Sequence, residues 1–317
     1  MRKHRSCQAI RFIAKIAILE DPQAPAQVVP LMAGVLSTRC IGGNGMIQVT
    51  WTGAAGLTFE TPDEIILIDP YYTRVDLFNT LLGPISPDEA AIDSALSAMQ
   101  KVKAVIVGHT HSDHALDVPY IIQRSNAQLV GSSSLDTLMT LAGLPGRTLV
   151  CRGGETVALS EHALVTMIRS AHGLVFAGKV PFQGEIRPSA TLPMKASGYR
   201  LGTVFAPRLQ IHGISFLHVG SANFIEEEVQ GYTCDVLFLC AAGWHKTEGY
   251  PHRLIDITRP GTVVLIHYDD FSKPHVKGTQ TRKLPLLDLK GMVRSIKAQF
   301  PQKDVVVPEI DARMSLG

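Results

Sequence analysis

The stretch that decides the fold is His109-Thr110-His111-Ser112-Asp113-His114, where three imidazoles and one carboxylate fall within six residues. It follows a largely apolar run, residues 102–107, that ends at Gly108. Because His109 and His111 are two residues apart, an extended backbone places both side chains on one side. Neutral imidazole is the commonest metal ligand, and a neighbouring carboxylate favours zinc or a similar divalent ion. The stretch therefore predicts a metal-binding loop.

The alternative interpretation of this stretch is a polar turn with solvated histidines. The chain contains 12 histidines among 317 residues. A pattern this dense is expected by chance in roughly one chain in a thousand of this composition, which favours the metal-binding loop.

Strand and helix patterns alternate on both sides of the loop. Residues 46–51 and 65–68 read as strands, and Gly53 and Gly56 flank a turn between the first of these and a second strand. Further strands are predicted at 164–168, 214–219, 236–240 and 262–266, with a helix at 134–142. This alternation predicts an α/β fold in which helices pack on sheets.

Some local predictions depend on single residues. Ser86 is a suitable N-cap for a helix that begins at Pro87. A short strand is predicted at 199–201, and residues 175–197, rich in glycine and proline, are predicted to form a loop over the site. The tail from Pro301 is expected to be peripheral.

The hexad resembles the signature of the metallo-β-lactamase superfamily, whose members are mostly two-metal hydrolases. Four other motifs support this: Trp51-Thr52-Gly53-Ala54-Ala55-Gly56, Ile68-Asp69-Pro70, His218-Val219-Gly220-Ser221-Ala222 and His267-Tyr268-Asp269-Asp270-Phe271. The resemblance runs from about residue 46 to about residue 274. Its details are most similar to the branch of ascorbate-phosphate lactonase and the phospholipase D-type enzymes that cleave N-acyl-phosphatidylethanolamine. It implies a four-layer αββα sandwich with two mixed β-sheets.

The resemblance also implies a ligand set. His172, at a strand end before a glycine, matches the third ligand of a first metal held with His109 and His111. Asp113, His114 and His267 match the ligands of a second metal. Asp113 is in addition the expected catalytic residue, which orients the nucleophile and shuttles its proton. The expected cofactor is Zn²⁺, as one or two ions, with Mn²⁺ or Fe²⁺ as alternatives.

One position departs from the usual pattern of the superfamily. Ser221 stands where most members have an aspartate that bridges the two metals, so the second site is expected to lose a negative charge. Asp269 and Asp270 are expected to orient His267 or partly replace this carboxylate. Asp69 is expected to support the metal loop, although an ordinary Asp-Pro turn that ends a strand is the simpler alternative.

Composition limits the class of protein. Apolar residues make up 45% of the chain and charged residues 18%, which is typical of a globular protein. A net charge of +2 gives no basic field for nucleic acid, and the five scattered cysteines suit a reducing compartment. Residues 1–45 are predicted to be an extension and linker before one domain at 46–317. Arg11 and Lys15 interrupt the apolar part of the extension, so a cytoplasmic location is expected, with a degenerate targeting segment as the alternative.

These observations predict a metal-dependent hydrolase that uses a metal-bound hydroxide on an ester, lactone or phosphodiester bond. The expected partner is a small-molecule substrate, without nucleic acid or a transmembrane segment, and both monomer and oligomer stay open. Two alternatives are kept: a β-lactamase-like amide hydrolase, and a non-catalytic metal-binding or sensing protein of the same fold. Ser221 is the one feature that favours the last.

Overall fold

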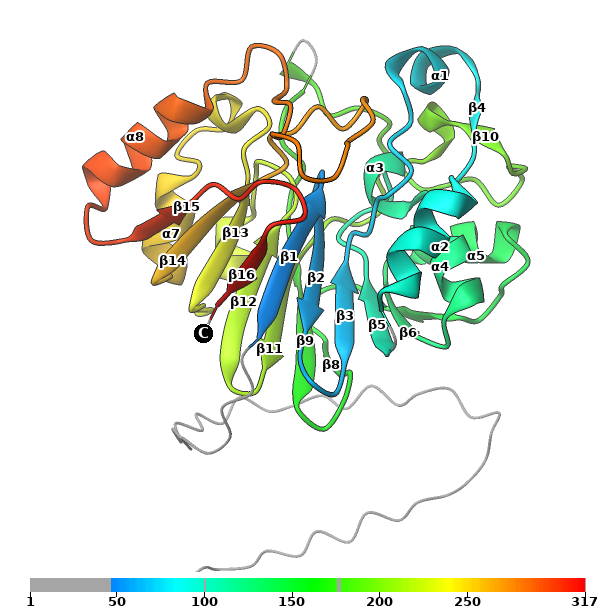
Figure 1. Ribbon diagram of the computed structural model, residues 1–317, viewed down its shortest axis with the longest axis horizontal. Helices are drawn as coiled ribbons and strands as arrows, with labels where there is room; N and C mark the ends of the chain where they lie inside the picture. The colour runs from blue at the N-terminus through cyan, green and yellow to red at the C-terminus, as the bar shows by residue number, and fades with distance from the viewer. Residues whose placement is uncertain (1–46, 100, 176–177, 317) are drawn as a thin grey trace, which may run out of the picture.

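Two seven-stranded sheets face each other in the computed structural model, which describes residues 47–99, 101–175 and 178–316 (Figure 1). The predicted extension at residues 1–45, and with it the predicted domain boundary at residue 46, lie outside the described residues. None of the helices in the described ranges is long and apolar enough to cross a membrane.

The first sheet has the order β16-β1-β2-β3-β5-β6-β7 and is antiparallel at its β16 side and parallel from β3 to β7. Its strands are β1 (Gln48–Gly53), β2 (Gly56–Glu60), β3 (Ile65–Ile68), β5 (Val102–Ile106), β6 (Gln128–Gly131), β7 (Thr148–Val150) and β16 (Arg313–Ser315).

The second sheet has the order β15-β14-β13-β12-β11-β9-β8 and is parallel from β12 to β15. Its strands are β8 (Thr156–Ala158), β9 (Ala163–Arg169), β11 (Phe205–Ile211), β12 (Ile214–Val219), β13 (Val236–Cys240), β14 (Thr262–Ile266) and β15 (Asp304–Val306). Two short strands, β4 (Pro84–Ile85) and β10 (Met194–Lys195), pair separately.

Helices cover the outer faces of both sheets. Their bounds are α1 (Leu77–Leu82), α2 (Glu89–Ser97), α3 (Ser112–Ala115), α4 (Val118–Arg124), α5 (Ser133–Leu141), α6 (Glu226–Val229), α7 (His252–Thr258) and α8 (Leu289–Gln299), with 3-10 turns at Ala196–Gly198 and Trp244–Lys246. Helices α2, α4 and α5 share an apolar cluster with the first sheet, whereas α7 and α8 pack on the second. The predicted four-layer αββα sandwich with two mixed sheets is therefore confirmed.

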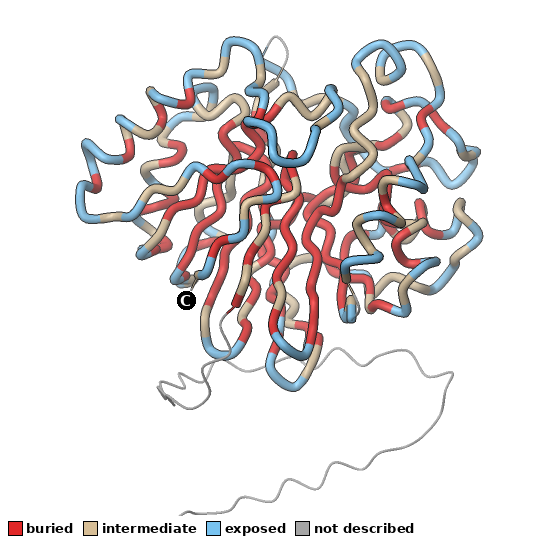
Figure 2. Tube along the Cα trace, in the orientation of Figure 1, coloured by how far each residue is buried: buried red, intermediate tan, exposed pale blue. Residues whose placement is uncertain are grey.

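Burial along the strands explains why these segments form sheets. Every residue of β3 and β13 is buried, as expected for central strands with both faces covered. In β1 buried positions alternate with partly exposed ones, because only one face looks toward the facing sheet. Figure 2 shows the same pattern, with buried residues concentrated along the strands.

Three local predictions are wrong. Helix α2 begins at Glu89 and not at Pro87, because the Asp88 side chain accepts a hydrogen bond from Ala91 N (3.0 Å) and so caps the helix in place of Ser86. Residues 199–201 form no strand, since their backbone groups bond to turns and loops in place of a neighbouring strand: Arg200 N donates to Gly198 O (2.9 Å) and Leu201 N to Phe182 O (2.9 Å).

The tail is the third error. It contributes β15 to the edge of the second sheet and β16 to the edge of the first, where β16 pairs with β1. Both strands are only three residues long, which leaves too little alternation in the sequence to identify them. The tail thus protects one edge of each sheet from water.

Candidate metal centre

The metal loop starts where β5 ends, beside the end of the parallel strand β3. The chain runs extended through His111 and then turns into the short helix α3, which contains Asp113 and His114. Gly108 allows this path, because a side-chain carbon there would lie only 3.1 Å from Asp69 Oδ2. The strands β9 and β14 of the second sheet lead to His172 and His267, so the six predicted ligands lie in the segments that follow β5, β9 and β14.

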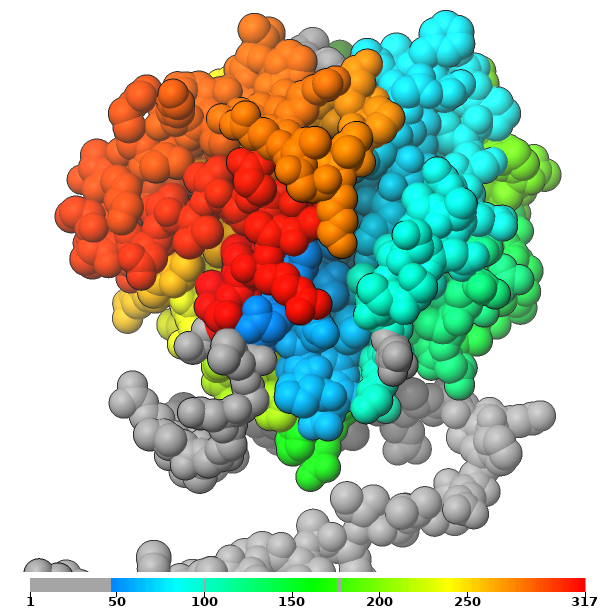
Figure 3. Space-filling model, in the orientation of Figure 1, coloured from blue at the N-terminus to red at the C-terminus, as the bar shows by residue number. Residues whose placement is uncertain are grey.

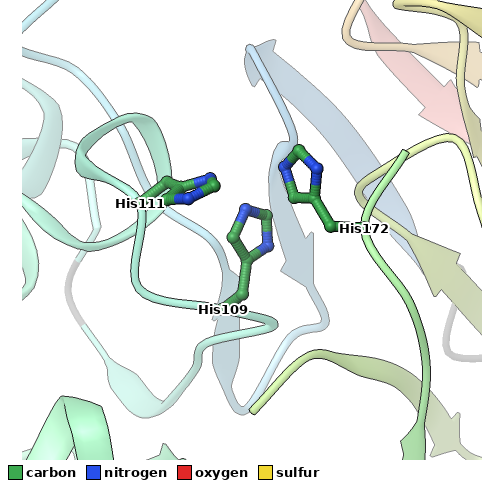
Figure 4. A group of neighbouring side chains, drawn as sticks. All are labelled: His109, His111 and His172. Atoms are coloured by element: carbon green, nitrogen blue, oxygen red, sulfur yellow. The ribbon is translucent and has the colours of Figure 1, made fainter. Parts of the chain in front are cut away.

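The first triad consists of His109, His111 and His172, whose nearest ligand atoms all lie within 4.8 Å of one another. Figure 4 shows the three rings arranged around one common space. His111 Nε2 donates to Pro181 O (3.2 Å) and His172 Nδ1 donates to Gly173 O (2.7 Å). Each of these two rings therefore keeps a lone pair on its other nitrogen, which is the form that binds metals.

The second triad consists of Asp113, His114 and His267, again with ligand atoms within 4.8 Å. Asp113 Oδ2 lies 3.3 Å from His267 Nε2 and 3.7 Å from His114 Nε2. The rings of His114 and His109 are 3.8 Å apart between centroids, so the two triads are adjacent. The structure brings together all six residues that the sequence predicts as ligands.

Burial sets the protonation of these groups. It lowers the pKa of His111 to about 3 and that of His172 to about 4, and it lowers the pKa of His109 well below its ordinary value. Although burial acts to raise the pKa of Asp113, the neighbouring His114 and His267 bring it below its usual range. At neutral pH the first triad is thus uncharged and Asp113 is ionised, as metal ligands must be.

Two unpaired atoms show that the residues fit a divalent ion. His109 Nε2 and His267 Nδ1 are buried and have no hydrogen-bond partner among the described residues. Buried polar groups are nearly always paired, so such nitrogens call for an explanation. Five imidazoles and one carboxylate form a donor set that suits Zn²⁺ and also Mn²⁺ or Fe²⁺.

Asp69 lies directly beneath the second triad and is fully buried. Its Oδ1 accepts from Gly108 N (2.6 Å) and its Oδ2 from His114 Nδ1 (2.8 Å), which directs His114 Nε2 toward Asp113. Its backbone has a φ of 46°, a conformation that costs free energy and that often occurs at functional sites. We propose that Asp69 supports the metal loop.

The sequence predicts no role for His218, although this residue begins the motif His218-Val219-Gly220-Ser221-Ala222. His218 is buried on β12, donates from Nε2 to Ala55 O (2.8 Å) and places Nδ1 3.9 Å from Asp69 Oδ2. A histidine inside a largely apolar strand was the available signal.

The other predicted supporting residues have different partners. Ser221 Oγ accepts a hydrogen bond from Gly173 N (3.0 Å), so the hydroxyl holds the backbone next to His172. Asp270 accepts from Ser272 Oγ (2.6 Å), whereas Asp269 accepts from Ala54 N (2.9 Å) and pairs with Arg74 (2.6 Å). Neither carboxylate belongs to a triad.

The predicted loop over the site does reach it. Besides the bond from His111 to Pro181, the ring of Phe182 stands perpendicular to that of His111 with centroids 6.1 Å apart. Phe182 is 45% exposed and has a φ of 41°, which is unusual for a bulky residue. Phe271 stands in a similar way 5.0 Å from His267. Each triad therefore has an aromatic ring beside it.

The chain is similar to proteins of a known family. The profile of the Beta-lactamase superfamily domain matches residues 48–267. A "UPF0173 metal-dependent hydrolase" of Polynucleobacter asymbioticus is 26% identical over 257 residues, which cover 78% of this chain and 82% of the relative.

Two solved structures share the fold. Igni18, a metallo hydrolase from Ignicoccus hospitalis, has a TM-score of 0.54 and 17% identity, and the match covers 85% of this chain and 97% of that one. CmlA, a diiron beta-hydroxylase from Streptomyces venezuelae, has a TM-score of 0.54 and 13% identity, over 86% and 55% of the two chains. With the profile spanning both triads and most of each sheet, the chain belongs to the metallo-β-lactamase superfamily.

Proposed function

We propose that the protein is a metal-dependent hydrolase that acts on an ester, lactone or phosphodiester bond. The observation that carries this proposal is the pair of adjacent buried triads, His109/His111/His172 and Asp113/His114/His267. The relatives named as metal-dependent hydrolases support it.

When bound, a divalent ion supplies Lewis acidity toward the carbonyl or phosphoryl oxygen of the substrate and toward water. The chain supplies the groups that orient and move the proton. Asp113 is ionised and its Oδ2 faces His267, so this carboxylate can orient the attacking water and accept its proton. The hydrogen bond from His114 to Asp69 keeps the neighbouring ring in place during this transfer.

The rings of Phe182 and Phe271 favour substrates with an apolar or planar group next to the scissile bond. Such a group could belong to either side of an ester, a lactone or a phosphodiester. The assignment to the lactonase and phospholipase D-type branch stays a prediction.

Zinc is the proposed ion, because five imidazoles and one carboxylate suit it well. The structural neighbour CmlA is a diiron enzyme, so Fe²⁺ belongs in the same test as Zn²⁺ and Mn²⁺.

The first experiment is elemental analysis of protein purified without chelator, followed by a screen of aryl esters, lactones, a bis-aryl phosphodiester and a β-lactam. We expect two metals per chain and turnover of an ester, lactone or phosphodiester. His111→Ala should lose both the metal and the activity. Full activity and metal content in His111→Ala would show that the proposed mechanism is wrong.

The matched control is His162→Ala. His162 is exposed and directly precedes β9. The seven residues of this strand, about 20 Å in length, separate it from the strand end that leads to His172. This variant should behave like the wild type. Turnover of the β-lactam alone would favour the amide hydrolase, and stoichiometric metal without any turnover would favour the non-catalytic alternative.

A further inference from the structure

A second candidate site lies on the outer face of the first sheet, away from the metal centre. Helices α2, α4 and α5 cover this sheet on its β3–β7 side, whereas the strands β1 and β2 turn threonines outward. Thr50 of β1 pairs with Thr58 of β2 on one side and with Arg313 of β16 on the other. Figure 3 looks onto this face, where the blue strands lie between cyan helical surface on one side and orange and red C-terminal segments on the other.

A cleft of about 420 Å³ occupies this position. Small-molecule sites usually measure about 300–1,000 Å³, so a compound of the size of a monosaccharide phosphate fits. The threonines form its floor, the small residues Ala91, Ser94 and Ala95 of α2 form one wall, and the segment with His275 and Lys277 forms the other.

Unpaired polar atoms are concentrated around the cleft. Thr52 Oγ1, Thr58 Oγ1, Tyr72 OH and His275 Nε2 are all buried without a hydrogen-bond partner among the described residues, and all four residues line it. Thr58 is only 6% exposed, and its hydroxyl faces that of Tyr72 without reaching hydrogen-bond geometry. The metal centre is the other place where such atoms gather, through His109, His218 and His267. Buried polar groups are nearly always paired, so the unpaired atoms in both places call for an explanation.

The charges of the cleft favour an anion at one end. Arg74 lines it with a side chain that is 9% exposed and that is already paired with Asp269 at 2.6 Å. Lys277 lines the same end and is the lining cation that forms no ion pair with any described residue, whereas Asp311 lies 3.7 Å from His275. At the opposite end Arg313 is neutralised by Glu60 at 3.0 Å.

We propose that this cleft binds a small hydroxylated anion, a phosphorylated or carboxylated compound of sugar size. Its anionic group contacts Arg74 and Lys277, and its hydroxyl groups bond to the threonines and Tyr72. The proposal is independent of the hydrolase function. The cleft and the metal centre are nevertheless connected through Arg74. This residue lines the cleft and pairs with Asp269, which follows His267 by two residues.

The test is isothermal titration calorimetry of the full chain with ribose 5-phosphate, gluconate and inorganic phosphate. We expect one site per chain, with a Kd below about 1 mM for ribose 5-phosphate or gluconate and weaker binding of inorganic phosphate, which lacks the hydroxylated chain. Tighter binding of ribose 5-phosphate would indicate a phosphorylated ligand, and tighter binding of gluconate would indicate a carboxylated one.

Substitutions on α2 provide the matched control. Ser94→Phe should fill the cleft and abolish binding, whereas Ser97→Phe, also exposed on α2 but outside the cleft, should bind normally. Lys277→Gln, a surface change, should weaken binding about 5- to 10-fold through the loss of one charged contact. His111→Ala should bind the ligand as the wild type does, even where it has lost metal.

Three outcomes would overturn the proposal. One is the absence of binding by the wild type for all three probes up to about 10 mM. Another is equal binding by Ser94→Phe and Ser97→Phe. The third is loss of binding in His111→Ala, which would place the anion at the metal centre.

Discussion

Replacement of Asp69 by asparagine tests whether this carboxylate orients His114 of the second triad. The carboxylate is fully buried and accepts two short hydrogen bonds, from Gly108 N at 2.6 Å and from His114 Nδ1 at 2.8 Å. In Asp69→Asn, the amide oxygen can still accept from Gly108 N, but the amide NH₂ then faces the protonated Nδ1 of His114. Either two donors oppose each other, or the proton of His114 moves to Nε2 and removes the lone pair needed for a metal.

The expected magnitude follows from this geometry. Loss of an outer partner of a metal-bound histidine typically lowers metal affinity 10- to 100-fold, which corresponds to about 1.4–2.7 kcal/mol. Loss of the charge-assisted hydrogen bond should also lower the free energy of unfolding of the metal-free protein by about 1.5–3 kcal/mol.

The assay is zinc titration in competition with a chromophoric chelator. For Asp69→Asn we expect the first equivalent of zinc to bind as in the wild type and the second to bind 10- to 100-fold more weakly. Asp93→Asn is the control, since this carboxylate is 42% exposed on α2 and contacts Arg124. If Asp69→Asn binds both equivalents with wild-type affinity, the assignment of Asp69 as the support of His114 is wrong.

Three further predictions concern other parts of the site. Burial raises the pKa of Asp117 from its ordinary value of 3.8 to about 6. Between these two values the folded chain binds more protons than the unfolded chain, so the free energy of unfolding falls as the pH rises through this window. The Tm of the wild type minus that of Asp117→Asn should therefore be larger near pH 4.5 than near pH 7.5, and a constant difference would contradict the assignment. Phe182→Ala should raise KM for substrates with an apolar group about 2- to 10-fold at unchanged metal content, whereas Leu286→Ala, fully exposed, should leave steady-state kinetics unchanged. Ser221→Ala leaves Gly173 N without its acceptor and should lower the free energy of unfolding by about 1–3 kcal/mol in denaturant titration, whereas Ser221→Thr, which keeps the hydroxyl, should lose less.

The order of the elements was predictable because local patterns encode them. The apolar runs of β3, β5, β13 and β14 are largely buried strands in the structure, and β3, β5 and β14 lead to Asp69, His109 and His267, at or shortly after the strand end. Segments with few residues or with competing side-chain bonds were not predictable. Asp88 replaces Ser86 as the cap of α2, and β16 is too short to show a period.

The sequence by itself determined the strand-and-helix order and the candidate ligands, because hydrophobic periodicity and the clustering of His109, His111, Asp113 and His114 are local properties of the chain. Only the tertiary structure decided what the isolated residues contact. Ser221 bonds to the backbone beside His172, Asp269 pairs with Arg74, and Arg74 and Lys277 line one cleft over β1. The physical reason is that each of these contacts depends on the three-dimensional path of segments far apart in the chain, which no spacing along the sequence specifies.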